Sequence, residues 1–408
     1  MTKILKKCIY WLAICVVLEN FMLFSAMGAP IQPSHLIFLI AILAALFGSE
    51  LHVKKTNLAV ALILFILPLV PLYRISDTME FIKSYVIYAL DIVFICFAVP
   101  EIIEVLSEPK VYDKFLRILI GAITLTELFG ILQFGLNNAI GRDIAYGIFG
   151  HFESHVCLTS YKFGVYRAYS IFHEPSVFAW ICSFGLAILL YKGKAVTENR
   201  IKLVFYYGIN AVAMLTTLST IGYVTYFLLL VCYFLLEKEI NASKLFLLVG
   251  LFVGVYLAIK YTNAANVVSR ITVELNAENS SGYERTVVPL EYLKRTLKYY
   301  PVFGRGLGQV GNVDKVGIIG LTSGVNNSLI GIFIDFGLSA IIPIAFFVKK
   351  MIMCLKYDRK FIIIVLNMLM VLFSTGAYMA LSVVVVQVCS FLLYFDPIKK
   401  AINCRKEI

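Results

Sequence analysis

The feature that most constrains the fold of this chain is a series of apolar runs that recur from one end of the sequence to the other. Most of these runs are about 15 to 25 residues long, and about 20 apolar residues form a helix long enough to cross a bilayer. The composition agrees, since 60% of the 408 residues are hydrophobic and only 15% are charged, which is unlike a soluble domain. The sequence therefore predicts an all-α, polytopic integral membrane protein in which residues 1–408 form one helical membrane domain.

The apolar runs predict about twelve membrane spans. The runs 203–236 and 361–395 are too long for single helices, so we divide them at 216–222 and 374–377, where Gly and hydroxyl residues permit a turn. The first run resembles a signal peptide but lacks a small-residue cleavage site, which indicates a retained helix. The expected spans are 8–27, 34–49, 57–73, 81–100, 115–135, 171–191, 203–217, 220–236, 244–260, 326–348, 361–376 and 378–395.

The distribution of Lys and Arg predicts that both termini lie in the cytoplasm, because most of the 36 basic residues then fall on the inner side. The net charge of +11 is on this interpretation a topology signal, and no basic stripe with interleaved aromatic residues suggests a nucleic-acid partner. Two long segments, 136–170 and 261–325, are then large extracytoplasmic loops. Loops of that length are uncommon unless they have a function.

The nine cysteines predict neither a metal site nor a disulfide framework. They form no spaced CxxC pair, and only Cys157 falls in a predicted outer loop. We therefore expect no metal and no cofactor.

The loop 261–325 contains a segment that predicts a helix lying in the membrane interface. It begins with a capping-box spacing at Ser281 and Glu284 and ends at Pro301, and Pro289 lies in its interior. Apolar residues fall on one face and charged residues on the other, as in an interfacial helix. The apolar face comprises Leu290, Leu293 and Leu297, and the charged face comprises Glu291, Lys294, Arg295 and Lys298.

Arg285, near the start of this helix, has two interpretations: a bidentate ligand for a lipid phosphate, or one half of a structural ion pair. Further on, Gly306, Gly308 and Gly311 match GxGxxG, but no hydrophobic strand precedes them, so we reject a dinucleotide site. The glycines at 304 and 306 instead predict a tight turn that lets the backbone approach a ligand or a helix end.

The second predicted outer loop ends in a polar segment that leads into the span 171–191. Pro175 suits the first turn of a helix, which places His173 and Glu174 at the outer mouth of that helix. Glu174 then has two possible roles, a carboxylate that complements the helix dipole or an acid/base group beside Arg167 and His173.

Four carboxylic acids fall within or near predicted spans, where an ionisable group is expensive and suggests function. They do not cluster at helical spacing, so we assign them no site. They are Glu19, Asp91, Glu127 and Asp335.

Taken together, several short motifs resemble the O-antigen polymerase (Wzy-type) and O-antigen ligase superfamily. The outer loop carries S-x-x-x-R from Ser281 to Arg285 and P-x-F-G-x-G from Pro301 to Gly306, and Asn327 opens an apolar span. Arg167 and the run FHEPS at 172–176 precede an earlier span. The resemblance covers the whole chain and implies a GT-C-like membrane glycosyltransferase.

The resemblance implies metal-independent glycosyl transfer between undecaprenyl-diphosphate-linked glycans at the outer face of the bacterial inner membrane. A diphosphate leaving group needs fixed cations, which the resemblance assigns to Arg167 and Arg285. The acceptor hydroxyl needs a base, for which Glu174 and His173 are the candidates. Further candidates for binding the substrate are Arg270, Arg295, Arg305, Asn326 and Asn327.

Three functions remain open, of which a polymerase of surface polysaccharide repeat units is favoured. A ligase is disfavoured because Asn326 stands where that branch typically has a histidine. A lipid-linked oligosaccharide flippase or other transporter would place its polar residues at the bilayer midplane, whereas this chain concentrates them in outer loops. Expected partners are the lipid-linked oligosaccharide, membrane lipid, a chain-length regulator and a flippase.

Overall fold

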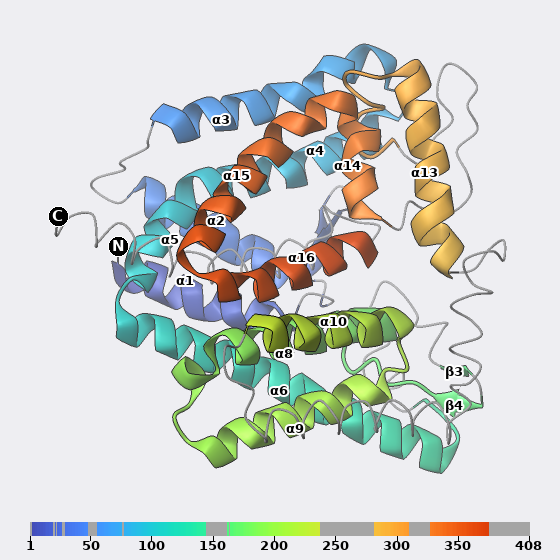
Figure 1. The fold of residues 1–408 in the computed structure, drawn as a ribbon. Coiled ribbons are helices and arrows are strands. Elements are labelled where there is room, and N and C mark those ends of the chain that lie inside the picture. Colours follow the sequence, from blue (N-terminus) through green and yellow to red (C-terminus); the bar gives the residue numbers. More distant parts are fainter. Residues whose placement is uncertain are drawn as a thin grey trace. The chain divides into compact units, whose positions relative to one another are not determined.

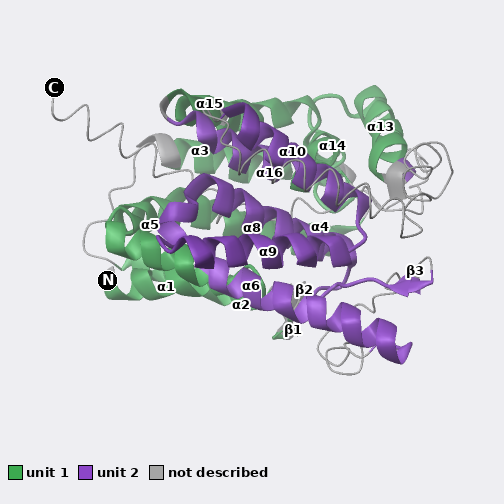
Figure 2. Ribbon diagram, turned by 60° about the horizontal axis from the view of Figure 1, so that its bottom comes forward, with its two compact units in different colours: residues 1–118, 284–357, 371–408 green, residues 119–283, 358–370 purple. Residues whose placement is uncertain are grey.

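The computed structural model describes the chain in ten segments and divides it into two compact units (Figure 2). The described residues are 2–18, 21, 23–26, 29–47, 55–75, 77–143, 161–162, 164–236, 281–309 and 327–374. Unit 1 comprises residues 1–118, 284–357 and 371–408, and unit 2 comprises 119–283 and 358–370. Within the described segments the chain is mainly helical, and its strands form two short antiparallel hairpins.

Four of the described helices are long and apolar enough to cross a membrane, at Thr78–Leu106, Pro109–Ile140, Pro175–Val196 and Ser328–Lys356. Three shorter apolar helices lie at Pro33–Leu46, Leu58–Tyr73 and Thr220–Leu236. The protein is thus an all-α membrane protein. The predicted spans 244–260 and 378–395 lie outside the described residues.

Unit 1 combines the N-terminal helices with residues 284–357 and 371–408 (Figure 2). The π-helix η2 joins α4 and α5 into one long helix, as the apolar run 81–100 predicts. Its elements are α1 (Thr2–Cys15), β1 (Phe24–Ala26), β2 (Ala29–Ile31), α2 (Pro33–Leu46), α3 (Lys55–Ile66), η1 (Leu67–Arg74), α4 (Thr78–Val93), η2 (Phe94–Ala98), α5 (Val99–Leu106), most of α13 (Ser281–Tyr299), α14 (Ser328–Phe336), η3 (Gly337–Ala340) and α15 (Ile341–Tyr357).

The predicted first span, 8–27, is wrong. Helix α1 begins earlier, at Thr2, and ends at Cys15, and the chain then forms the hairpin of β1 and β2. Pro30 lies in the second strand of this hairpin, and proline is tolerated in an edge strand but not in a helix interior. The apolar run therefore continues past the end of the helix.

The predicted span 326–348 is interrupted in the structure. Helix α14 ends at Phe336, Gly337 adopts a φ of 60°, and the chain changes direction through η3 into α15 (Figure 1). Such a break leaves helix-terminal carbonyl and N–H groups without intrahelical partners. A neighbouring segment supplies those partners.

That segment is 301–306, which we call the glycine clip. Arg305 N and Gly306 N donate to the carbonyls of Ile334 and Asp335 at distances of 2.8 and 3.0 Å. In return, the carbonyls of Pro301 and Val302 accept from the N–H groups of residues 338 and 339, at 2.8 and 2.9 Å. The clip therefore satisfies the backbone on both sides of the helix break.

The glycines of the clip are required by this close approach. A Cβ on Gly304, whose φ is 60°, would lie 2.4 Å from the carbonyl atoms of Asp335 and 2.5 Å from Gly337 N. A Cβ on Gly337 would in turn lie 2.5 Å from Gly304 N. The prediction that a glycine here lets the backbone approach a helix end is confirmed for Gly304.

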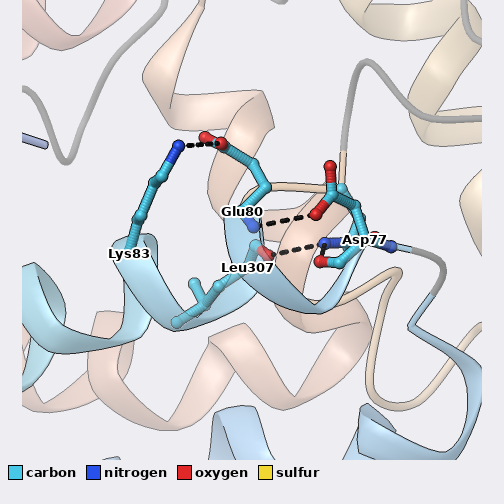
Figure 3. A network of polar contacts seen from close by, with 5 residues as sticks. Asp77, Glu80, Lys83 and Leu307 are labelled. Carbon is cyan, nitrogen blue, oxygen red and sulfur yellow. Dashed lines mark hydrogen bonds and ion pairs between the residues drawn. The ribbon is translucent and has the colours of Figure 1, made fainter. Parts of the chain in front are cut away.

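Beyond the clip, the chain is fastened to the start of α4 (Figure 3). Gln309 accepts from Asp77 N at 3.2 Å and donates to the carbonyls of Asp77 and Leu307, at 2.9 and 3.4 Å. Gly308 lies so close to α4 that a Cβ there would be 2.6 Å from Ser84 Oγ. The glycines at 304 and 308 thus make room for neighbouring protein, in agreement with our rejection of a dinucleotide site.

Unit 2 contains the later part of α6 (Pro109–Ile140) and a group of helices that follow it. The prediction that 203–236 divides near 216–222 is confirmed, because α9 ends at Thr216 and α10 begins at Thr220. Its other elements are β3 (Tyr161–Lys162), β4 (Val165–Tyr166), α8 (Pro175–Val196), α9 (Arg200–Thr216), α10 (Thr220–Leu236), η4 (Arg359–Phe361) and the first part of α16 (Ile362–Ser374).

A buried polar network lies between the helices of unit 2. Asn210 on α9 donates to Glu127 on α6 and, at 2.8 Å, to the carbonyl of Cys182 on α8. Tyr226 on α10 donates to the Asn210 side-chain oxygen at 3.0 Å. Glu127 therefore serves at least a structural role, joining helices through a satisfied network.

Candidate functional site

Arg285, the first of the predicted site residues, lies on α13 in unit 1 and is held at two points. Its Nε donates to the carbonyl of Ser374, the last residue of α16, at 3.1 Å. Its own carbonyl accepts from Asn327 Nδ2 at 3.0 Å. The guanidinium side chain is half-buried, so its orientation is set by protein contacts.

Asn327 lies at the N-cap of α14 and is 1% exposed. Its side-chain oxygen accepts from Ile330 N at 3.2 Å, while its amide nitrogen binds Arg285. Both functional groups of this side chain are therefore engaged within the protein.

Two further candidates on this part of the chain are not brought to Arg285 by a described contact. Arg295 is exposed on α13. Arg305 is 6% exposed in the glycine clip, and its guanidinium lies 6.0 Å from the ring centroid of Tyr292. A cation over an aromatic face is stabilised by the ring quadrupole. Arg270 and Asn326 lie outside the described residues.

Helix α13 confirms the helix predicted to start at Ser281 and end before Pro301. Its buried face, however, carries Val288, Tyr292 and Thr296, whereas Leu290 is 48% exposed and Leu293 and Leu297 are half-buried. The predicted apolar stripe is thus separate from the face that packs in unit 1, and its place in the membrane interface stays a prediction. The side chains of the proposed capping box lie outside the described residues.

In unit 2, the polar segment 166–176 is fixed to α6 by two amide side chains. Asn138 pairs with the backbone of Tyr166, accepting from its N–H at 2.8 Å and donating to its carbonyl at 2.9 Å. Gln133 Oε1 accepts from the N–H groups of Tyr169 and Ser170 at 3.0 and 2.7 Å. The segment is therefore bound to α6 along several residues.

Ser170 holds an unusual conformation within this segment. It is fully buried with a φ of 57°, and its hydroxyl donates to the carbonyl of Thr126 at 2.7 Å. A residue other than glycine in the left-handed region costs about 1 kcal/mol or more and persists only where its surroundings impose it. The contacts to α6 thus determine the path of the chain on either side of Ser170.

Arg167 is oriented in the same manner as Arg285. Its Nε donates at 3.0 Å to the carbonyl of Thr217, the C-cap of α9, and the next residue, Ala168, donates through its N–H to Thr216 O at 3.0 Å. The second non-glycine residue with positive φ among the described residues, Leu218, follows directly, with a φ of 46°. A cation at a helix C-terminus is favourable because the carbonyl ends of the helix carry partial negative charge.

His173 and Glu174 precede α8 as predicted, with Pro175 in its first turn and Glu174 at the N-cap. Glu174 is exposed, its side chain makes no capping hydrogen bond to the helix backbone, and it accepts from Ser176 Oγ at 2.8 Å. Phe172 and Phe178 stack on either side of this turn. The two candidates for the base therefore share one well-packed turn.

The site residues thus form two groups, one in each unit. Arg285 and Asn327 are joined in unit 1, and Arg167, His173 and Glu174 lie on one anchored segment of unit 2. Each group has an arginine whose Nε is fixed by a carbonyl at the end of a helix, an arrangement that leaves the planar guanidinium in a defined orientation. Preorganised cations of this kind stabilise a developing anionic charge.

Several residues that build these groups were not predicted, namely Gln133, Asn138, Thr217 and Ser374. The two that act through backbone carbonyls leave no trace in a sequence. Gln133 and Asn138 could have been found from the sequence. Together with Asn137 they are amide residues at the end of an otherwise apolar run, just before a long loop.

Comparison with protein families supplies the decisive observation. A family model described as WcaD colanic acid polymerase matches residues 8–394, which is nearly the whole chain. The protein belongs to this family. Among curated proteins, none matched the chain.

Membership of the WcaD colanic acid polymerase family confirms the resemblance to Wzy-type polysaccharide polymerases. The family supports polymerisation of polysaccharide repeat units, and polymerisation of a glycan is glycosyl transfer. The long apolar helices and the family together identify a membrane protein of polysaccharide biosynthesis.

Proposed function

We propose that this protein polymerises the repeat units of a surface polysaccharide, an O-antigen or a capsule, by moving the growing glycan from undecaprenyl diphosphate onto a lipid-linked repeat unit. The reaction takes place at the outer face of the bacterial inner membrane, without a metal ion. About twelve spans in a GT-C-like arrangement, with both termini in the cytoplasm, give that topology. The observation that carries the proposal is the fixed orientation of Arg285 in a chain of a polymerase family.

The chemistry follows from the charge that the leaving group acquires. When the glycosidic bond to the carrier breaks, negative charge grows on the diphosphate, and fixed guanidinium groups stabilise it. Arg285 and Arg167 supply that charge, while Glu174 or His173 accepts the proton of the attacking sugar hydroxyl. Arg270, Arg295, Arg305 and Asn326 hold the glycan and the lipid headgroup.

The test is a set of Arg285 variants expressed in a strain from which the gene has been deleted, with the surface polysaccharide resolved on a gel. Arg285→Ala removes both the charge and the hydrogen bond to Ser374, and we expect single repeat units in place of a ladder. We expect Arg285→Lys to restore the ladder poorly, because the ammonium group of lysine does not reproduce the planar, bidentate hydrogen bonding of a guanidinium. Arg285→Gln keeps an N–H donor for the Ser374 carbonyl without the charge, and we expect it to fail as well.

The control is Arg200→Ala, which removes an exposed cation at the start of α9, and we expect it to leave the ladder unchanged. The amount of each variant in the membrane is measured by immunoblot. A normal ladder from Arg285→Ala, or one restored by Arg285→Gln, would refute the charge-based role. In the deletion strain itself, long chains retained on the lipid carrier would indicate a ligase, and single units trapped on the cytoplasmic face would indicate a flippase.

A further inference from the structure

The carbonyl of Arg285 lacks its ordinary helical partner. In an α-helix a carbonyl accepts from the N–H four residues later, and that residue is Pro289, which has no N–H. The helix continues through Pro289 to Tyr299, so the Arg285 carbonyl receives no hydrogen bond from residue 289.

Asn327 supplies the missing donor from another part of the chain. Its Nδ2 lies 3.0 Å from the Arg285 carbonyl, a normal distance for an N–H···O hydrogen bond. The same side chain caps α14 through its oxygen, so one residue joins the start of α14 to the turn of α13 that carries Arg285. These residues all lie in unit 1.

The burial of Asn327 favours an indirect role over the substrate-binding role expected from the sequence. The side chain is 1% exposed, and its oxygen and its nitrogen both bind within the protein. Its chemical effect passes through Arg285.

The side chain of Arg285 is restrained from a different direction. Its Nε donates to Ser374 O, at the end of α16, and Ser374 is 2% exposed. Asn327 therefore holds the main chain of Arg285 while the end of α16 holds its guanidinium. Moving a catalytic cation by about 1 Å reduces rate by up to about a hundredfold, so both restraints matter.

We infer that Asn327 is a positioning residue for Arg285, replacing the hydrogen bond that Pro289 removes so that the guanidinium meets the diphosphate of the lipid-linked donor. This inference rests on the proposed function, because a diphosphate leaving group is what makes the position of Arg285 critical.

The capping and positioning roles of Asn327 separate cleanly by substitution. Asp and Ser cap helices about as well as Asn does, so Asn327→Asp and Asn327→Ser keep the bond to Ile330 N. Asp has no N–H to donate to the Arg285 carbonyl, and Ser is too short to reach it. The chain provides a matched control in Asn199, which caps α9 through its oxygen, accepting from Ile201 N and Lys202 N. Asn199→Asp tests the same exchange away from Arg285.

The assay uses the purified full-length protein in lipid vesicles and the lipid-linked repeat units that accumulate in the deletion strain, with chain elongation followed by gel. We expect Asn327→Asp and Asn327→Ser to lower kcat by about 10- to 100-fold, with the apparent Tm unchanged and Asn199→Asp at the wild-type rate. In an Arg285→Lys background, which retains residual elongation, Asn327→Asp should cause a smaller loss than in the wild type, because residues that act as a unit are not additive.

Elongation by Asn327→Asp at the wild-type rate would overturn the positioning role while leaving the polymerase intact. So would an Asn327→Asp loss in the Arg285→Lys background as large as that in the wild type. A fall in apparent Tm that accounts for the lost rate would also overturn it. Failure of the wild-type protein to elongate these repeat units would instead refute the proposed function, and the inference with it.

Discussion

Replacing Gly304 by alanine tests whether the glycine clip is a main determinant of stability in unit 1. The added Cβ would lie 2.4 Å from the carbonyl carbon and oxygen of Asp335, and because these are backbone atoms, no rotamer change can relieve the contact. The clip must then move away from the break between α14 and α15. Gly337→Ala creates the reciprocal contact, 2.5 Å from Gly304 N.

The expected cost follows from the contacts that are lost. Four backbone hydrogen bonds join the clip to the break, and at about 1 kcal/mol each they contribute about 4 kcal/mol. A non-glycine residue at a φ of 60° adds about 1 to 2 kcal/mol. The sum, about 5 to 6 kcal/mol, is a large fraction of the free energy of unfolding of a typical domain, which is about 5 to 15 kcal/mol.

The assay is the apparent Tm of the detergent-solubilised protein, measured by the fraction that stays monodisperse after heating. Gly135→Ala is the matched control, since a Cβ on this helical glycine of α6 meets no atom within 4 Å and alanine favours a helix by about 1 kcal/mol. We expect a strong loss from Gly304→Ala and none from Gly135→Ala. Equal stability of the two variants, or a Gly304→Ala, Gly337→Ala double variant whose loss is the full sum of the singles, would refute the reasoning.

Two further predictions concern unit 2. Gln133→Leu removes the acceptor of the buried N–H groups of Tyr169 and Ser170, which costs about 1 to 3 kcal/mol for each group. We therefore expect shorter polysaccharide chains on a gel from Gln133→Leu, and chains closer to wild type from Gln133→Glu. Unchanged chain length in Gln133→Leu would contradict the anchoring of this segment by Gln133. Glu127→Gln retains an oxygen that accepts from Asn210, so we expect an unchanged apparent Tm, whereas Glu127→Leu should lower the apparent Tm. A strong loss of polymer from Glu127→Gln at an unchanged apparent Tm would show that the carboxylic acid of Glu127 is itself needed for function.

Helix boundaries set by proline and glycine could be predicted from the sequence, because these residues act on their own backbone. Pro175 and Pro301 fixed the start of α8 and the end of α13, and the glycines at 304 and 306 indicated a backbone approach. The same reasoning failed at the end of α1, where apolar composition alone extended the helix into a hairpin.

The packed face of α13 and the hydrogen bonds of Asn327 could not be predicted, because both depend on which other segments of the chain pack against them. Hydrophobicity indicates the stripe through Leu290 as a membrane-facing surface, whereas the face that packs against neighbouring elements carries Val288 and Tyr292. The sequence suggests a substrate contact for Asn327, because it does not reveal that the amide of Asn327 meets the carbonyl of Arg285.

The glycine clip also constrains the order in which the chain acquires its structure during synthesis. Residues 301–306 leave the ribosome before 334–339, whose backbone groups they bind. Until α14 and α15 have been inserted, the clip cannot form its four hydrogen bonds to the helix break, and unpaired peptide groups are not tolerated in hydrocarbon. The clip must therefore remain in water or among lipid headgroups during insertion and bind the helix break late. Its binding is then among the last steps in the folding of this part of unit 1.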